Sequence, residues 1–402
     1  MNVLFFSQRG FDTYGGGELV AGILSSLLKE KGINVFQATL YNKSSKAKNK
    51  TLFIASSMQQ KKRRKIMSLF YDPVLTKNLK KIKKIFNIDL IYAQAAPTVA
   101  QKLVRVARKI KLPIIVAVHS WSYLCPTGYK VRMPKLIPCN SISLTECLKC
   151  RVFITGLDRS QSRHALSHLC SLQYHLLASK YVLRTANYIV APSRIFCREI
   201  EKQLNQRCLN VPNPIDPTLL NINPHPRGDG SVLFLGRLSL IKGIPVIVNI
   251  AKRLSNTLIH VAGEGPLKLW LLEKKPPNVL YHGFVHGVRK SKLLEKTSIV
   301  IVPSLCVEMF PYVIVEAFAF AKPVIAFDLG GSKELVEMSG GGLLAKPFNI
   351  AEFADHIKYL LENKTAASKM GIRGRKWVEK TLHPDRIVKL LIRIFDKCVE
   401  SL

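Results

Sequence analysis

The chain has 402 residues, more than one hydrophobic core usually supports, so we expect two domains of about 200 residues each. Its 48% content of hydrophobic residues indicates a folded globular protein and excludes a disordered chain. Nine cysteines in a chain this long argue against a disulfide-rich secreted scaffold, and a formal net charge of +35 predicts an anionic partner, either a nucleic acid or a membrane surface.

The sequence starts directly with an apolar run, Val3 to Phe6, which we expect to be a strand. No charged segment precedes it, no small-residue cleavage site follows it, and no apolar run reaches about 18 residues. We therefore expect a cytoplasmic protein without a signal peptide or a membrane-spanning helix.

A glycine-rich turn, Gly15 to Gly17, separates this strand from a helix predicted over 18–29. Glycines at such a turn let backbone N–H groups approach an anion at the start of the helix. The same glycines also suit a plain turn, so both interpretations stay open.

Positive charge is concentrated in the run Lys61 to Lys65 and in a helix predicted over 74–86. Five apolar residues fall on one face of that helix: Leu75, Leu79, Ile82, Ile85 and Phe86. Lysines cover the other faces, and on anionic lipid each basic residue near the surface contributes about 1 kcal/mol. The helix alone also fits an ordinary surface helix, but for the whole basic zone we favour a membrane surface.

Strands predicted over 90–93 and 114–118, with a helix between them, indicate a parallel sheet. His119 follows the second strand, at the edge where α/β sheets bind ligands, so a ligand-facing role and a structural role are both open. Four cysteines occur in the next part of the chain, the last two as C-x-x-C: Cys125, Cys139, Cys147 and Cys150. They fit either a structural zinc site or a loop insertion with four reduced thiols.

The domain boundary is predicted at 212–217, where three prolines form a stiff linker. Residues 1–211 then form the first domain and 212–383 the second. A helical stripe of apolar residues within 384–402 is expected to pack on the first domain.

The second half repeats the alternation of strands and helices. Three strands are expected there: 232–235, 258–262 and 279–282. The loop after the first of them carries Gly236, Arg237 and Lys242 and leads into a helix. The guanidinium group of Arg237 and the ammonium group of Lys242, placed at a helix start, suit the binding of a diphosphate. Two solvated cations in a loop would give the same sequence pattern. The third strand leads to a loop that contains Phe284. Backbone groups of this loop can form hydrogen bonds with the edge of a nucleotide base.

Residues 299–331 are predicted to form strand, loop, helix, strand and loop, with Glu308 in the first loop, Pro311 in the first helical turn and Glu316 inside the helix. On one helix the two carboxylates would be roughly 12 Å apart, farther than the about 5–9.5 Å of paired glycosidase carboxylates. We expect them instead to accept hydrogen bonds from hydroxyls at opposite ends of one phosphate-bearing ligand. Glu308 alone would be interpreted as a solvated loop residue, whereas the apolar neighbours of Glu316 argue for a role.

Eight short motifs follow one another along the chain: GGG at 15–17, P-S at 192–193, N-P-I-D at 213–216, G-R-L-x-x-x-K-G at 236–243, A-G-E-G-P at 262–266, P-S at 303–304, E-x7-E at 308–316 and G-G-S-x-E at 330–334. Their combination resembles glycosyltransferase family 4 over about residues 3–397. The resemblance implies the GT-B fold, two Rossmann-like α/β domains with parallel sheets facing across a cleft and a last helix that crosses back to the first domain. Ala321 stands where the family commonly has glycine, a change that we expect to affect packing only.

The resemblance further implies a retaining glycosyltransferase that uses a nucleotide diphosphate sugar and requires no metal or other cofactor. By that likeness the catalytic residues are Glu308, which contacts the donor sugar, Lys242 and Arg237, which hold the diphosphate, and His119, which faces the transferred sugar. Glu316 would bind the ribose. The other donor-binding residues would be Gly16, Gly17, Gly236, Phe284, Met309, Phe310, Pro311 and Tyr312.

We therefore expect a hexosyltransferase-like enzyme, peripheral on the inner face of the membrane, that glycosylates a glycan or lipid-linked acceptor in cell-envelope or exopolysaccharide biosynthesis. One alternative is a nucleotide-sugar epimerase of the same fold, against which the E-x7-E pattern argues. Another is a nucleic-acid-binding protein, which needs basic residues interleaved with base-stacking aromatic ones. The lysine-rich segments carry few such aromatic residues, so we expect no nucleic-acid partner.

Overall fold

The computed structural model describes residues 1–8, 11, 16–39, 52–54, 72–133, 135, 137–139, 143–155 and 165–401. The chain divides into two compact units, here called the first domain (1–135, 139–214 and 384–402) and the second domain (136–138 and 215–383). The basic run Lys61 to Lys65 and Gly15 lie outside the described residues. No helix in the described part of the chain is both long and apolar enough to cross a membrane.

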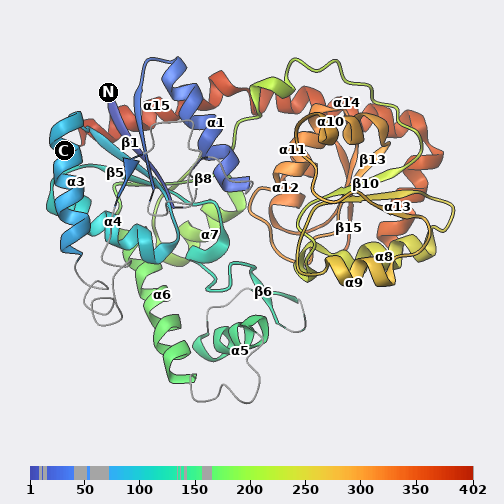
Figure 1. The fold of residues 1–402 in the computed structure, drawn as a ribbon, viewed down its shortest axis with the longest axis horizontal. Helices are drawn as coiled ribbons and strands as arrows, with labels where there is room; N and C mark the ends of the chain where they lie inside the picture. The colour runs from blue at the N-terminus through green and yellow to red at the C-terminus, as the bar shows by residue number, and fades with distance from the viewer. Residues whose placement is uncertain are drawn as a thin grey trace. The chain divides into compact units, whose positions relative to one another are not determined.

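The first domain is built on a seven-stranded parallel sheet with the strand order β3-β2-β1-β4-β5-β8-β9 (Figure 1). The strands of this sheet are β1 (Asn2–Ser7), β2 (Asn34–Thr39), β3 (Leu52–Phe53), β4 (Leu90–Gln94), β5 (Ile114–Ala117), β8 (Tyr188–Ala191) and β9 (Cys208–Asn210). Between β5 and β8 the chain also forms a separate two-stranded sheet of β6 (Val131–Arg132), in the first domain, and β7 (Ile137–Pro138), which is grouped with the second. The helices of the first domain are α1 (Gly16–Glu30), α3 (Pro73–Phe86), α4 (Pro97–Lys109), η2 (Trp121–Tyr123), α5 (Leu144–Thr155), α6 (Ala165–Thr185), α7 (Arg194–Leu204) and α15 (Pro384–Glu400). The rings of Tyr92 on β4 and Phe395 on α15 lie 5.6 Å apart, so the C-terminal helix packs on this sheet.

Helix α3 begins and ends where its sequence predicts. The Asp72 carboxylate caps it by accepting a hydrogen bond from the Leu75 N–H (3.0 Å), and Asn87 ends it in the left-handed conformation (φ 46°). Leu75 and Leu79 are buried, as predicted. Ile85, predicted on the same buried face, is 58% exposed, because it lies in the last turn of the helix and points away from the sheet core.

The second domain is built on a six-stranded parallel sheet with the strand order β12-β11-β10-β13-β14-β15. Its strands are β10 (Val232–Leu235), β11 (Ile259–Ala262), β12 (Val279–Tyr281), β13 (Ile299–Val302), β14 (Val324–Phe327) and β15 (Gly342–Ala345). Its helices are η4 (Pro217–Leu219), η5 (Leu240–Lys242), α8 (Ile244–Arg253), α9 (Lys268–Lys274), α10 (Gly287–Lys296), α11 (Tyr312–Ala319), α12 (Gly330–Ser339), α13 (Ile350–Glu362) and α14 (Lys364–Thr381).

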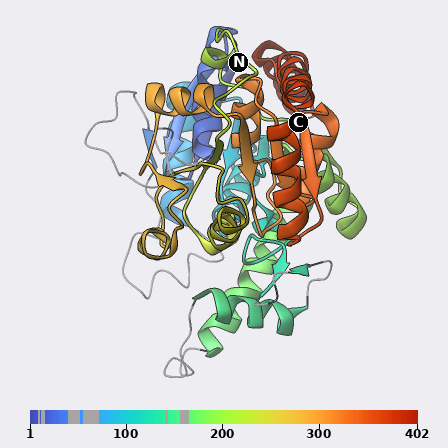
Figure 2. The ribbon, with the colours of Figure 1, turned by 90° about the vertical axis from the view of Figure 1, so that its right-hand side faces the viewer.

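Alternate residues of β10 serve two separate cores in this domain. Val232 and Phe234 pack with α8, α9 and α13, whereas Leu233 packs with α10, α11, α12 and α14. Figure 2 shows these helices layered over the sheet. A strand covered on both faces is apolar at nearly every position, which explains the continuous apolar runs of the second half. The predicted fold class, two α/β domains with parallel sheets, is confirmed.

Three local expectations for residues 299–331 need correction. Gly330 and Gly331, predicted as a loop, form the first turn of α12, and Pro311 caps α11 instead of lying in its first turn. Ala321, expected to affect packing only, has a φ of 51° in the left-handed region beyond the end of α11. Glycine adopts this conformation freely, so alanine introduces backbone strain of about 1 kcal/mol there.

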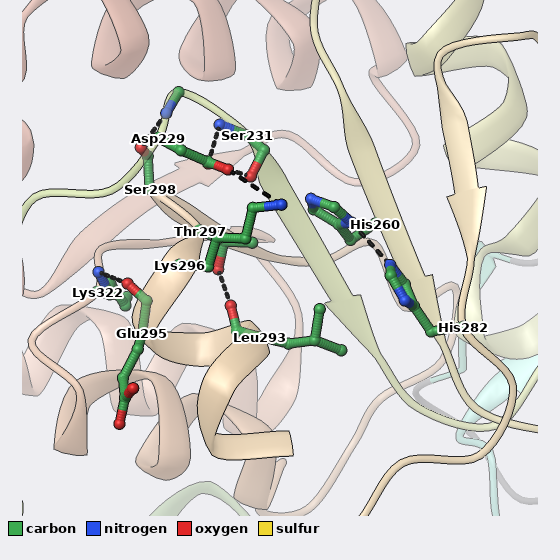
Figure 3. Close-up of polar contacts among 11 residues, drawn as sticks. Asp229, Ser231, His260, His282, Leu293, Glu295, Lys296, Thr297, Ser298 and Lys322 are labelled. Carbon is green, nitrogen blue, oxygen red and sulfur yellow. Dashed lines mark hydrogen bonds and ion pairs between the residues drawn. The ribbon is translucent and has the colours of Figure 1, made fainter. Parts of the chain in front are cut away.

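Polar side chains hold the amino ends of the second sheet together (Figure 3). Lys322, which precedes β14, is fully buried and donates hydrogen bonds to the backbone carbonyls of Arg227 (3.0 Å) and Glu295 (2.9 Å). The Asp229 carboxylate accepts hydrogen bonds from the backbone and hydroxyl of Ser231, at the start of β10. These contacts satisfy backbone groups that the helix and strand ends would otherwise leave without partners.

Candidate active site

The loops at the carboxyl ends of β10, β11, β12 and β13 are joined by backbone hydrogen bonds. The Gly263 N–H, after β11, donates to the Gly283 carbonyl after β12 (2.7 Å). The Leu305 N–H, after β13, donates to the Ile241 carbonyl in η5 (2.8 Å). Residues that are far apart in the sequence therefore meet at this edge of the sheet, where α/β folds bind their ligands.

Two glycines let these loops approach each other closely. Gly243 has a φ of 79°, and a Cβ atom there would lie 2.0 Å from the Pro303 carbonyl oxygen. A Cβ atom on Gly331 would lie 2.2 Å from the Met309 carbonyl oxygen, and the Gly331 N–H donates to the Glu308 carbonyl (2.7 Å). The glycines of the motifs at 236–243 and 330–334 are thus needed to hold the loop that carries Glu308.

Glu308 lies in the loop between β13 and α11, as predicted, with 13% of its side chain exposed. One carboxylate oxygen accepts a hydrogen bond from the Lys242 ammonium group, and the other accepts one from the Ser304 hydroxyl. Partial burial strengthens this ion pair relative to one on the open surface. Ser304 was part of a predicted motif without an assigned role, and its contact with Glu308 gives it one.

Glu316 lies inside α11 and is buried, as predicted. Its carboxylate accepts a hydrogen bond from the ammonium group of Lys290 on α10 (2.6 Å). A buried carboxylate needs such a partner, because the cost of removing the charge from water is otherwise unopposed. Lys290 was not among the predicted site residues, since no spacing distinguishes it from Arg289 and Lys292 on the same basic helix.

Two predicted donor-binding side chains of this edge are accessible. Arg237, directly after β10, is exposed, and no hydrogen bond or ion pair joins it to another residue in the described part of the chain. Phe284 is 43% exposed, with its ring 5.8 Å from the ring of His286. Gly236, which precedes Arg237, is half-buried. An unengaged guanidinium between β10 and η5 leaves this edge with an available positive charge.

The start of α11 presents backbone groups beside Glu308. Met309 and Tyr312 are buried and Phe310 is half-buried, so the segment is packed in place. Within the residues that the structure describes, none accepts a hydrogen bond from the N–H of Met309 or Phe310. Burial raises the pKa of the Tyr312 phenol well above its usual value, so this side chain stays neutral. Available N–H groups directly before a helix start favour an anionic ligand.

Two predicted residues, Gly17 and His119, meet in the first domain at the carboxyl ends of β4 and β5. A Cβ atom on Gly17 would lie 2.8 Å from the Gln94 side-chain nitrogen and 3.9 Å from the His119 Cβ, whereas nothing lies within 4 Å of one on Gly16. Gln94, which sequence reasoning missed, donates to the Gly17 carbonyl (2.7 Å), and its Oε1 is buried with no partner in the described structure. Burial lowers the pKa of the His119 ring to about 4, so the imidazole is neutral near pH 7.

Comparison with known proteins finds a family match within the second domain. Residues 216–377 match the model of the family Glycosyl transferases group 1. An uncharacterized glycosyltransferase of Methanocaldococcus jannaschii is 28% identical over 207 residues, which are 50% of this chain and 57% of that protein. The O-antigen chain mannosyltransferase C of Escherichia coli is 23% identical over 180 residues, which are 43% of this chain and 48% of that protein. The chain thus spans about half the length of the curated relatives it matches.

Solved structures match both domains. The HepE protein of Anabaena, crystallised with UDP, superposes with a TM-score of 0.70 at 18% identity and covers 99% of this chain and 100% of its own. A sucrose-phosphate synthase from Thermosynechococcus elongatus gives a TM-score of 0.74 at 17% identity, with 100% of both chains covered. At these identities the likeness concerns the fold alone, and the predicted GT-B fold is confirmed.

Proposed function

We propose that this protein is a retaining glycosyltransferase of family 4 that moves a sugar from a nucleotide diphosphate sugar to a glycan or lipid-linked acceptor. The observation that carries the proposal is the arrangement of Glu308 just before helix α11, with Lys242 and Ser304 on its carboxylate. Beside it, the N–H groups of Met309 and Phe310 find no acceptor among the described residues. Cations and helix N–H groups suit a pyrophosphate, and a carboxylate suits sugar hydroxyls.

In this proposal the second domain binds the donor. Lys242 and Arg237 hold the diphosphate and stabilise the negative charge that develops on the leaving nucleotide, so no metal ion or cofactor is required. Glu308 contacts the donor sugar, and Glu316, positioned by Lys290, accepts hydrogen bonds from the ribose hydroxyls. Gly236, Phe284 and the segment 309–312 complete the donor site.

The first domain contributes Gly16, Gly17 and His119. Gly17 is a site of close backbone approach, which suits a phosphate, and Gln94 fixes its carbonyl. With its pKa lowered to about 4, His119 acts near pH 7 as a neutral hydrogen-bonding group beside the transferred sugar and not as a cation.

For the acceptor we propose a cell-envelope or exopolysaccharide glycan, reached from the inner face of the membrane. The similarity to an O-antigen chain mannosyltransferase supports the glycan. A hollow at the carboxyl ends of α3 and α4 supports contact with anionic lipid, because five lysines line it: Lys80, Lys83, Lys84, Lys109 and Lys111. Salt would then weaken binding to anionic vesicles steeply, whereas binding independent of salt would contradict a charge-driven contact.

A thermal-shift panel of UDP-, GDP-, ADP- and CMP-sugars tests the donor. A bound donor stabilises the folded state by mass action, so one nucleotide diphosphate sugar should raise the unfolding temperature of the wild type. The shift should be lost in Lys242→Ala and kept in Lys268→Ala, which removes an exposed lysine paired with Glu264. If no sugar nucleotide shifts the wild type and none is turned over, the proposal is wrong.

A further inference from the structure

The chain makes a long excursion between β5 and β8, and its first part forms a small lobe, defined here as residues 121–155. Figure 1 shows α5 and β6 of this lobe lying away from the seven-stranded sheet. The lobe has two strands of two residues each and the helix α5. Its buried apolar residues in the described part are few: Trp121, Tyr123, Leu124, Val131 and Met133. A core of this size is too small to hold a lobe together, and proteins usually add a crosslink or a metal ion in such places.

Four cysteines supply the candidate crosslink, one from each of two turns and two from one helix. Cys125 begins a turn that Gly128 closes by donating its N–H to the Cys125 carbonyl (2.8 Å). Cys139 directly follows β7, where its N–H donates to the Lys130 carbonyl (2.9 Å). Cys147 and Cys150 lie one turn apart on α5, on the same side of the helix. The four residues thus lie on α5, directly after β7 and in the turn that follows η2.

The four sulfur atoms lie in one neighbourhood, because those of Cys147 and Cys150 are each within electrostatic range of the Cys125 and Cys139 sulfur atoms. The Cys150 thiol also lies 3.9 Å from the Val131 carbonyl on β6. The Met133 N–H donates a hydrogen bond to the Cys150 sulfur (3.2 Å), and the Cys125 sulfur lies 3.2 Å from the Thr127 hydroxyl. Donors aimed at sulfur stabilise thiolates, and orienting partners of this kind surround metal-bound cysteines.

We propose that Cys125, Cys139, Cys147 and Cys150 bind one structural zinc ion that holds the lobe together. Four thiolates are a complete tetrahedral ligand set for zinc and leave no open position for catalysis. Among the described residues, no three histidine, cysteine, aspartate or glutamate side chains are gathered closely enough to hold a metal ion. In our proposal the four thiols move together on the ion, and metal binding completes the order of the lobe.

Metal analysis of the full-length protein, purified without chelators, tests this site. We expect about one zinc per chain, reduced to background in both Cys147→Ser and Cys150→Ser. Cys170→Ser is the matched control, because Cys170 is an exposed cysteine on α6, outside the lobe, and this variant should keep its zinc. Zinc that persists in both lobe variants would contradict the proposal.

A titration of the chelator-treated wild-type chain with Co2+ provides a second measurement that does not depend on the folding of a variant. Tetrahedral thiolate coordination should give an intense visible absorption that Zn2+ displaces. The proposal is overturned if the wild-type chain binds neither ion and if the four thiols of the lobe remain reactive in the presence of both ions. An iron–sulfur absorption in the purified protein would overturn the assignment of zinc.

Discussion

Both ends of the six-stranded sheet hold buried charged groups, but they hold them in different ways. At the carboxyl ends, Glu308 and Glu316 are paired with the flexible ammonium groups of Lys242 and Lys290, which come from other loops and helices. At the amino ends, Lys322 donates to two backbone carbonyls and is fully removed from solvent (Figure 3). A side-chain partner can turn toward a ligand, whereas a backbone carbonyl is fixed by the fold. The first arrangement suits binding and the second suits stability.

Replacing Glu308 should have the largest effect on activity. Glu308→Ala or Lys242→Ala is expected to reduce sugar transfer by roughly a hundredfold or more, because each removes a charged group from the proposed donor site. The unfolding temperature should change little, since both side chains lie in loops at the open edge of the sheet. Initial rates and thermal unfolding of the same preparations measure the two quantities, with Lys268→Ala as the control at an exposed ion pair. Near-normal turnover would contradict the proposed role of this pair.

Lys322→Met, at the amino ends, should lower stability and leave activity unchanged, the opposite of the changes at Glu308 and Lys242. The change leaves two buried carbonyls without their donor, at a cost of about 2–3 kcal/mol in the free energy of unfolding. Activity per folded molecule should not change. Lys358→Met is the control, because Lys358 is 65% exposed and should contribute little. Urea unfolding measures the difference, and equal stability of the two variants would show that the buried contacts do not support the fold.

The Lys322 side chain also predicts how stability depends on pH. Burial lowers its pKa to about 8 from the usual value of 10.5, so the unfolded chain binds this proton more tightly than the folded chain. Stability of the wild type should therefore rise between about pH 8 and pH 10. Lys322→Met should lack this part of the rise. If the stability of the two proteins rises equally over this pH range, Lys322 is not the group responsible for the rise.

Gly331→Ala should reduce activity by about tenfold without replacing any charged group. Its new Cβ atom would lie 2.2 Å from the Met309 carbonyl oxygen, so the loop that carries Glu308 must move, and small displacements of a catalytic group have large effects on rate. Glu337→Ala, an exposed position on the same helix, is the control. Full activity of Gly331→Ala would mean that the position of this loop does not limit the reaction.

The sequence predicts the fold and part of the site, because the signals for both are local. Apolar runs with helices between them define the parallel sheets, and the spacing of Glu308 and Glu316 places one carboxylate before α11 and the other inside it. Lys290 and Lys322 could not be predicted. Each lysine finds its partners across the fold, up to 95 positions away in the chain, and local sequence does not mark which lysine of a very basic protein becomes buried.

The smallest effect is expected for a pair of histidines in the second domain, His260 in β11 and His282 directly after β12, which Figure 3 shows near Lys296. The Nδ1 atom of His260 lies 2.7 Å from the Nε2 atom of His282. Burial lowers the pKa of both rings, Lys296 lowers both further, Arg289 acts on His282, and Asp229 opposes the shift of His260. The folded chain therefore binds acid protons less readily than the unfolded chain.

Stability should accordingly fall as the pH drops below about 6.5, the usual pKa of histidine. His260→Asn keeps a hydrogen-bonding group near the Nδ1 position but cannot gain a charge, so its stability should fall less between about pH 7 and pH 5. His225→Asn is the control, because it removes an exposed histidine outside the pair. If His260→Asn loses stability in acid as steeply as His225→Asn does, the histidine pair is not an acid-sensitive element of this domain.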